Sequence, residues 1–215
     1  RAIAVGFAAG AVAAAFKIIL QIVEVAHSRL LASMPEALWQ RSLVAAGLAT
    51  VGTLVAILIG KYDKDAGGSG IPHVKAVLEG HAQMNWSRLI WFKFSAAVAA
   101  IGAGLALGRE GPTVQMGAAV GGEVSRRAAL DPHDTRTLSS ALAGAGLGVA
   151  FSAPLGGAVF VFEELDRAIR TRLLVATLVG SSVALAVAYV IVGREPVLPV
   201  GRVEPGPLWV LPIYV

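Results

Sequence analysis

Glu110 is the residue of this sequence whose setting points most directly to chemistry. It lies in the motif Gly-Arg-Glu-Gly-Pro of residues 108–112, directly after an uncharged stretch from Phe94 to Gly108. Because charge is costly in hydrocarbon and in a protein interior, an ionisable carboxyl in such a place is a functional candidate by default. Its chemistry would be the binding and release of a proton, and competition with other anions for the same surroundings.

The residues after Glu110 predict the start of a helix. Pro112 stands in the expected first turn, where the missing N–H of proline costs nothing. A helix that starts there aims unpaired N–H groups at whatever lies beside Glu110, and such groups form an anion site. The carboxylate of Glu110 can occupy this site or leave it.

Two more segments repeat the pattern of a flexible break followed by proline and helix. In Gly67–Pro72 the hydroxyl of Ser69 can donate to an anion, although an ordinary glycine-rich turn with a serine N-cap explains this segment better when it is taken alone. A phosphate-binding P-loop is disfavoured, because no Gly-Lys-Ser/Thr follows and no strand precedes. Phe151–Gly157 repeats the break, with Pro154 at the expected helix start.

The helix after Pro154 is expected to end in two adjacent acids, Glu163 and Glu164, before a basic loop. Acids at a helix C-terminus oppose the helix dipole. For Glu163, a solvated cytoplasmic helix end softened by Arg167 and Arg170 is the better explanation. For Glu164 the residues alone leave a structural and a functional role open.

The composition indicates an all-α membrane protein. Hydrophobic residues make up 56% of the 215 residues, charged residues only 15%, and the mean hydropathy is +0.71. Helices are the expected spanning structure, since the ten-residue period of membrane barrel strands is missing. The apolar segments that approach or exceed the roughly 20 residues of a membrane span are Ala2–Ala26, which Lys17 and Glu24 interrupt, Leu43–Gly60, Thr137–Phe162 and Leu173–Gly193.

Several apolar pieces are too short or too broken to cross alone, which predicts helices that end inside the membrane. They are residues 71–80, residues 112–124 and the two halves of Thr137–Phe162 on either side of Pro154. Non-helical backbone at that depth survives only where it is buried in protein or lines a cavity. Pairs of glycines four residues apart predict close helix packing at Gly104 and Gly108, Gly117 and Gly121, and Gly144 and Gly148.

The basic residues predict the orientation in the membrane. Basic clusters next to apolar segments are expected in the cytoplasm: residues 61–64, then Arg126, Arg127 and Arg136, then Arg167, Arg170 and Arg172. The loop from His27 to Arg41 and the proline-rich tail from Arg194 to Pro212 would then face outward.

Other classes of site find little support in the residues. Zero cysteines exclude disulfides and thiolate metal sites, and the histidines form no i,i+4 pair, so no metal site is expected. The basic residues lie in short loops rather than in a stripe with interleaved aromatics, which argues against a nucleic-acid partner. No enzyme motif is present, so we expect an ion transporter or channel without catalytic residues or a cofactor.

Taken together, the three motifs resemble the CLC family of chloride channels and chloride/proton antiporters. Gly-Ser-Gly-Ile-Pro at 68–72, Gly-Arg-Glu-Gly-Pro at 108–112 and Ala-Pro-Leu-Gly-Gly at 153–157, followed by the Glu-Glu pair, occur in the family's order and at similar intervals. The resemblance implies the first inverted repeat of a CLC-type transporter, with tilted and broken helices, at residues 1–193. Residues 194–215 would be an extracellular linker and the start of the second half.

The resemblance also assigns roles to single residues. Glu110 would be the gating carboxylate that competes with chloride and exchanges protons with the outside, and Glu164 would be the intracellular proton-transfer glutamate typical of antiporters. The implied chloride-binding residues are Ser69, Gly70, Ile71, Arg109 and Gly111, and the implied helix-start and supporting residues are Pro72, Pro112, Pro154 and Glu163.

The chain departs from the family pattern in several places. The second half, with its Gly-x-Phe-x-Pro helix start and its chloride-coordinating tyrosine, is absent from these residues, so the missing C-terminal half is an expected partner. His73 stands where many homologues carry an acid, and Lys75 follows shortly after it. Lys93 could supply a positive field for anions, but snorkelling to the membrane interface explains it better.

The sequence therefore predicts voltage- or proton-linked chloride transport by a multi-pass protein of the cell (inner) membrane. The favoured form is H⁺/Cl⁻ antiport by the complete homodimer, surrounded by lipid, with chloride and protons as the transported ions. A passive chloride channel of the same family is one alternative. A non-transporting structural half or fragment is an alternative of another class.

Overall fold

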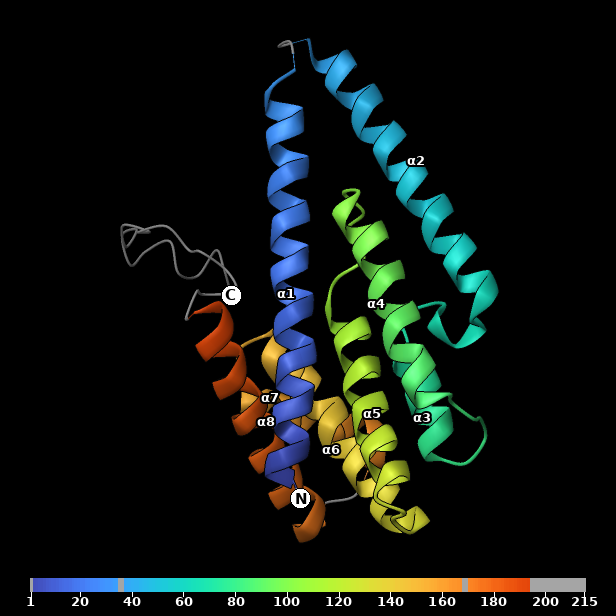
Figure 1. Ribbon diagram of the computed structural model, residues 1–215, viewed down its shortest axis with the longest axis vertical. Helices are drawn as coiled ribbons and strands as arrows, with labels where there is room; N and C mark the ends of the chain where they lie inside the picture. Colours follow the sequence, from blue (N-terminus) through green and yellow to red (C-terminus); the bar gives the residue numbers. More distant parts are fainter. Residues whose placement is uncertain (1, 35–36, 168–169, 194–215) are drawn as a thin grey trace, which may run out of the picture.

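Nearly all of the described chain is helical. The structure is a computed structural model that describes residues 2–34, 37–167 and 170–193. Its elements, shown in Figure 1, are α1 (Ala2–Ala32), α2 (Leu38–Tyr62), the 3₁₀ turn η1 (Lys64–Ala66), α3 (Ile71–Leu78), α4 (Trp86–Gly102), α5 (Glu110–Arg127), α6 (Pro132–Ala150), α7 (Pro154–Phe160), the π-helical turn η2 (Val161–Asp166) and α8 (Thr171–Val192). No strand occurs within these ranges, so the all-helical prediction is confirmed. The linker predicted at 194–215 lies outside the described residues.

Three helices of the described part are long and apolar enough to cross a membrane, judged by length and composition: Ile3–Ala32, Leu38–Tyr62 and Thr171–Val192. They coincide with three of the predicted apolar segments. α1 corrects one expectation, because it runs through His27 to Ala32, and α2 already begins at Leu38. The connection is therefore shorter than the predicted loop from His27 to Arg41. The reason is local, since no glycine or proline occurs between residues 11 and 34.

The fourth predicted segment, Thr137–Phe162, is broken as expected. α6 ends at Ala150, residues 151–153 leave the helical conformation, and α7 begins at Pro154. α7 has only 7 residues and α3 only 8, so neither can span a bilayer. The prediction of broken helices is confirmed.

α5 and α6 pack closely in the centre of the molecule. A Cβ added to Gly121 of α5 would lie 2.7 Å from the carbonyl oxygen of Leu138 of α6, and one added to Gly117 would collide with the carbonyl of Leu142. Further along α6, a Cβ added to Gly148 would lie 3.3 Å from the Cα of Pro154 at the start of α7. The predicted glycine packing is confirmed at these positions.

Gly104 and Gly108 behave differently from the other glycine pairs. They lie in the connection between α4 and α5, with φ angles of +95° and +71°. Helix packing is therefore the wrong explanation for this pair. Glycine is needed here because residues with a side chain rarely adopt these backbone conformations.

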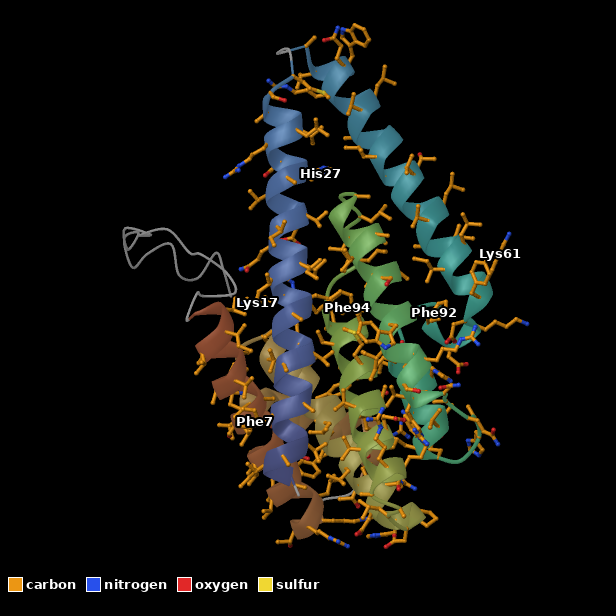
Figure 2. All side chains as sticks on the ribbon, viewed as in Figure 1. Phe7, Lys17, His27, Lys61, Phe92 and Phe94 are labelled. Carbon is orange, nitrogen blue, oxygen red and sulfur yellow. The ribbon has the colours of Figure 1, made fainter. Side chains whose placement is uncertain are left out.

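α2 stands apart from the central helices over most of its length. Its side chains in Figure 2 are mainly carbon, and apolar residues such as Leu43, Leu54 and Leu58 are exposed. Gly52 is its one buried residue, and it packs on Ala99 and Ala103 at the end of α4. Contact with α4 therefore places α2 along one side of the α4–α5 region.

Two of the predicted cytoplasmic clusters share one end of the molecule. Figure 1 places the turn between α5 and α6 and the start of α8 at the same end. These segments carry Arg126, Arg127 and Arg172. The side of the membrane that this end faces stays a prediction.

Candidate functional site

The first turn of α5 and the loop before α3 line one cavity of about 620 Å³. Ser69 contributes from the loop, Glu110 and Gly111 from α5, and Lys93 from α4. α2 closes one side with Ile57 and its neighbours. Two of the motifs found in the sequence, which lie some 40 residues apart (Ser69 and Glu110), are therefore brought together.

Ser69 is packed directly against the first turn of α5. A Cβ added to Gly111 would lie 3.0 Å from the Ser69 hydroxyl and would collide with the Ser69 carbonyl oxygen. Only glycine at position 111 allows this approach. The Ser69 hydroxyl consequently lies beside the N-terminal end of α5, on the cavity.

The N-terminal end of α5 carries free N–H groups next to a carboxylate. Glu110 is the first residue of α5, so the helix begins two residues earlier than the predicted start at Pro112. The N–H of Thr113 donates to the Arg109 carbonyl at 3.2 Å, which makes Thr113 the first residue with an intrahelical acceptor. The N–H groups of Glu110 and Gly111 precede it, and Pro112 has none. The helix dipole adds positive potential at this end.

Glu110 is half-buried, and its carboxylate folds back over the preceding loop. A Cβ built on Gly108 would collide with both carboxylate oxygens of Glu110. Glu110 thus faces the cavity from the start of α5, and neither lipid nor bulk solvent surrounds it on all sides.

The start of α3 is fixed to α5 by Gln115. Gly70 caps α3 with a φ of +92°, and a Cβ there would collide with the Gln115 side chain. The Gln115 amide donates to the carbonyl of Asp65 at 2.7 Å and contacts Nδ1 of His73 at 3.1 Å. Ile71 and Pro72 occupy the first two positions of α3, behind the Ser69 loop that lines the cavity.

The Arg109 side chain points to α1. Its guanidinium lies 3.5 Å from the carboxylate of Glu24. This ion pair holds the loop before Glu110 against α1. Arg109 can therefore attract an anion in the cavity only through its backbone or through its charge at a distance.

Lys93 does not snorkel to the interface, and this expectation was wrong. The residue is 3% exposed, and its ammonium donates to the carbonyls of Ala66 at 3.1 Å and Gly68 at 2.6 Å. The ammonium thereby replaces the water that it loses on burial with two backbone acceptors. It holds the loop that carries Ser69 and places a positive charge on the cavity wall.

The third sequence motif lies elsewhere. Pro154 starts α7 against α6, and it is not among the residues that line the cavity. Glu163 and Glu164 follow on the π-helical turn η2, and both residues are exposed. Glu164 forms an ion pair of 3.0 Å with Lys75 of α3, an element that begins at the cavity loop.

Asp166 is a residue that the sequence argument missed. Its carboxylate is 3% exposed and pairs with Arg136 of α6 at 3.0 Å and with Arg170 at 3.6 Å. Arg170 was expected to soften the charge of Glu163, and it turns to Asp166 instead. The signal that could have found Asp166 is its spacing of four residues from Arg170 within the basic loop.

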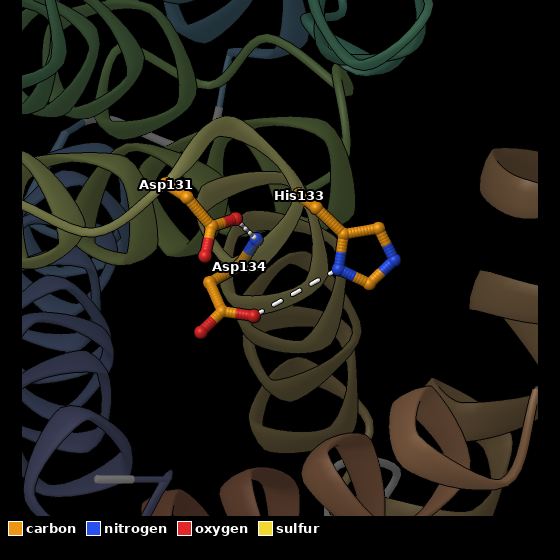
Figure 3. Close-up of side chains that lie close together, drawn as sticks. All are labelled: Asp131, His133 and Asp134. Carbon is orange, nitrogen blue, oxygen red and sulfur yellow. Dashed lines mark hydrogen bonds and ion pairs between the residues drawn. The ribbon is translucent and has the colours of Figure 1, made fainter.

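Three potential metal ligands lie close together at the start of α6 (Figure 3): Asp131, His133 and Asp134. Asp131 is the N-cap of α6, accepting the Asp134 N–H at 2.8 Å, and this hydrogen bond lowers the pKa of the Asp131 carboxyl. Asp134 pairs with Arg172 at 2.8 Å. Capping and ion pairing account for both carboxylates, so the cluster gives no case for a metal site.

Known proteins resemble this chain in both sequence and fold. The family described as "Voltage gated chloride channel" matches residues 51–215. The H⁺/Cl⁻ exchange transporter ClcA of Vibrio vulnificus is 36% identical over 220 residues, which cover 98% of this chain and 46% of that protein. Its namesake in Vibrio cholerae is 40% identical over 159 residues, covering 73% of this chain and 33% of that protein.

The solved structures include a slow cyanobacterial Cl⁻/H⁺ antiporter with a TM-score of 0.82 and 30% sequence identity. The match covers 99% of this chain and 51% of the antiporter chain. The match thus spans between a third and a half of the length of the curated relatives named above, and about half of the length of the solved antiporter chain. The family match includes both motifs that line the cavity and extends over most of the residues. The chain is a multi-pass integral membrane protein that belongs to the voltage-gated chloride channel family of ion transporters and channels.

Proposed function

We propose that the complete protein exchanges chloride for protons across a membrane, and that Glu110 is its gating carboxylate. The observation that carries the proposal is the position of Glu110 at the N-terminal end of α5, on the same cavity as Ser69 and Lys93. The names of the relatives, which are H⁺/Cl⁻ exchangers, support the same activity.

The mechanism follows from competition between two anions for one positive site. Ionised Glu110 and chloride both favour free N–H groups at a helix N-terminus, so either can displace the other. Protonation removes the negative charge of Glu110 and releases the site to chloride. Because the protonated and the ionised states favour different occupants, the movement of a proton is linked to the movement of chloride.

The surrounding groups have separate tasks in this proposal. The Ser69 hydroxyl donates to chloride. The N–H groups of Gly70, Ile71 and Gly111 contribute further donors along the same ion path. Lys93 raises the positive potential of the cavity and fixes the Ser69 loop through Ala66 and Gly68. Pro72 and Pro112 keep the first turns of α3 and α5 in place without adding an N–H.

Glu164 is the proposed intracellular proton acceptor. It lies on an exposed turn, away from the residues that line the cavity, where water can reach it. Water between the two acids would carry the proton to Glu110. Pro154 and Glu163 support this turn, and we further propose a homodimer in the cell (inner) membrane whose ion path includes groups from a second half of the protein.

Flux measurements on the complete protein in liposomes test the proposal. Wild type should move protons against a gradient when chloride flows down its own. Glu110→Gln should abolish proton movement, because glutamine cannot take up a proton at that site. Glu164→Gln should still move chloride but without protons. Persistent pH-driven chloride uptake by Glu110→Gln would contradict the gate, and unchanged coupled proton flux in Glu164→Gln would contradict the proton path.

A passive chloride channel is the competing function within the family, and the carboxyl at position 164 disfavours it. Reversal potentials separate the two. For an antiporter the reversal potential moves when only the pH gradient is changed, whereas for a chloride-selective channel it stays at the chloride equilibrium value.

A further inference from the structure

Lys75 and Glu164 form an ion pair between two elements that are far apart in the chain. The ammonium donates to the Glu164 carboxylate at 3.0 Å across a separation of 89 residues. The Lys75 side chain is 21% exposed and that of Glu164 is 48% exposed. Water therefore reaches the carboxylate while the ammonium is largely covered, so the pair is open to proton exchange from one side.

Lys75 connects Glu164 to the element that begins at the cavity. It is the fifth residue of α3, whose cap Gly70 directly follows Ser69. An α-helix rises 1.5 Å per residue, so the 8 residues of α3 extend about 12 Å from the cavity loop. A single rigid helix thus carries the Ser69 loop at one end and the cation that contacts Glu164 further along.

The turn that carries Glu164 is anchored separately. Asp166 binds Arg136 of α6 at 3.0 Å and Arg170 at 3.6 Å, so these two guanidinium groups already have a carboxylate partner. Glu163 and Asp166 add negative charge on the turn itself. Among the described elements packed against η2, α7 carries no charged residue, α3 carries His73 and Lys75, and α6 carries His133, Asp134 and Arg136. Of these groups, Lys75 is the one that pairs with Glu164.

We propose that Lys75 is a positioning residue that holds the ionised Glu164 carboxylate against α3 and releases it when the carboxylate accepts a proton from water. This inference rests on the proposed function and names a control on its intracellular proton step. Protonation neutralises the carboxylate, so its attraction to the ammonium is lost, while Lys75 keeps its own protons. The proton is then free to move onward with a side chain that α3 no longer holds.

The pair has a predictable effect on the coupling of the two fluxes. When a neutral residue replaces Lys75, no ammonium holds the ionised Glu164 carboxylate against α3, so fewer protons should move for each chloride. A partly exposed ion pair contributes little, so the number of protons moved per chloride should fall by about twofold.

The test uses the complete protein in liposomes with matched pH on both sides and a chloride gradient. Proton flux and chloride flux are both measured, and their ratio is the readout. Lys75→Gln should lower the number of protons moved per chloride by about twofold, and Lys75→Arg, which keeps the charge, should restore the wild-type ratio. Lys61→Gln is the matched control, because Lys61 is exposed in the last turn of α2 (Figure 2) and should leave the ratio unchanged.

A second arm separates positioning from a general structural role. In a Glu164→Gln background, adding Lys75→Gln should leave chloride flux unchanged, because the partner is already gone. An unchanged ratio of protons to chloride in Lys75→Gln, or a further loss of chloride flux in the double variant, would overturn the inference while leaving H⁺/Cl⁻ exchange intact. Wild type that moves no protons at all would instead overturn the proposed function, and the inference with it.

Discussion

The Glu110 carboxylate lies over Gly108, in the space that a Cβ on residue 108 would fill. Gly108 also has a φ of +71°, so a side chain there is disfavoured by the backbone as well as by the collision. The resting position of the proposed gate therefore depends on the absence of a single methyl group. This relationship leads to a test that does not change the titrating residue.

Gly108→Ala should displace the Glu110 carboxylate from its position at the start of α5. We expect chloride flux to persist while the number of protons moved per chloride falls at least several-fold, as in a protein whose gate no longer returns to its site. Proton and chloride fluxes in liposomes measure this ratio. The matched control is Gly80→Ala, since Gly80 has a φ of +81° but nothing within 4 Å of an added Cβ. Equal loss of coupling in both variants would show that backbone strain, and not the collision, is responsible.

Lys93→Met should weaken chloride binding and destabilise the fold together. The buried carbonyls of Ala66 and Gly68 would lose their donor, which costs about 1–3 kcal/mol for each group left unpaired. The loop with Ser69 would be less well held, and the cavity would lose a positive charge. Calorimetric chloride titration and thermal unfolding in detergent measure both effects.

Lys17→Met provides the comparison for Lys93→Met. Lys17 lies on α1 and is half-buried, outside the residues that line the cavity. Its replacement removes the same charge from the protein, and chloride affinity should stay within twofold of wild type. Similar losses of affinity in the two variants would argue for an effect of net charge and against a local role of Lys93.

The sequence allowed the helix breaks and the cavity-lining carboxyl of Glu110 to be located because these features have local signals. Proline and glycine mark Pro154 and the Ser69 loop, and an isolated carboxyl after an uncharged stretch marks Glu110. The contact between the Ser69 and Glu110 motifs was reached only through resemblance to a family. Their approach depends on packing at Gly111, which no local pattern encodes.

The cationic side chains could not be placed from the sequence, because their partners are distant in the chain. Lys93 reaches carbonyls 25 and 27 residues away, and Lys75 reaches Glu164 across 89 residues. Snorkelling was a reasonable expectation for Lys93 from its position at the start of an apolar segment. The tertiary fold buries this residue in the middle of α4, so backbone carbonyls take the place of water.

Gly117→Ala should destabilise the contact between α5 and α6. An added Cβ would collide with the carbonyl of Leu142, and neither backbone can move without disturbing the central packing. We expect a loss of about 1–3 kcal/mol in thermal unfolding. Gly47→Ala on α2 is the control, since an added Cβ there meets nothing within 4 Å and alanine favours helix by up to about 1 kcal/mol. Opposite shifts in the unfolding temperature are therefore expected, and a neutral Gly117→Ala would mean that the two helices are less tightly packed than described.

Asp131→Ala should destabilise the start of α6 at neutral pH and much less in acid. The Asp131 carboxylate accepts the Asp134 N–H at 2.8 Å, and this bond lowers its pKa below the ordinary value of 3.8. A group whose pKa is lowered by folding contributes stability above its unfolded pKa and loses it as the pH falls through its folded pKa. The difference in unfolding temperature between wild type and Asp131→Ala should thus be a few degrees at pH 7 and should shrink below pH 3.8.

Asp131→Asn separates capping from charge at this position. Asparagine caps a helix about as well as aspartate but does not titrate, so the variant should match wild type at pH 7. Its unfolding temperature should then exceed that of wild type as the pH falls below 3.8, because the amide keeps its acceptor while the carboxylate takes up a proton. If Asp131→Asn instead behaved like Asp131→Ala at neutral pH, the contribution of Asp131 would come from its negative charge beside Arg172 and the helix dipole, and the cap hydrogen bond would be a minor part of it.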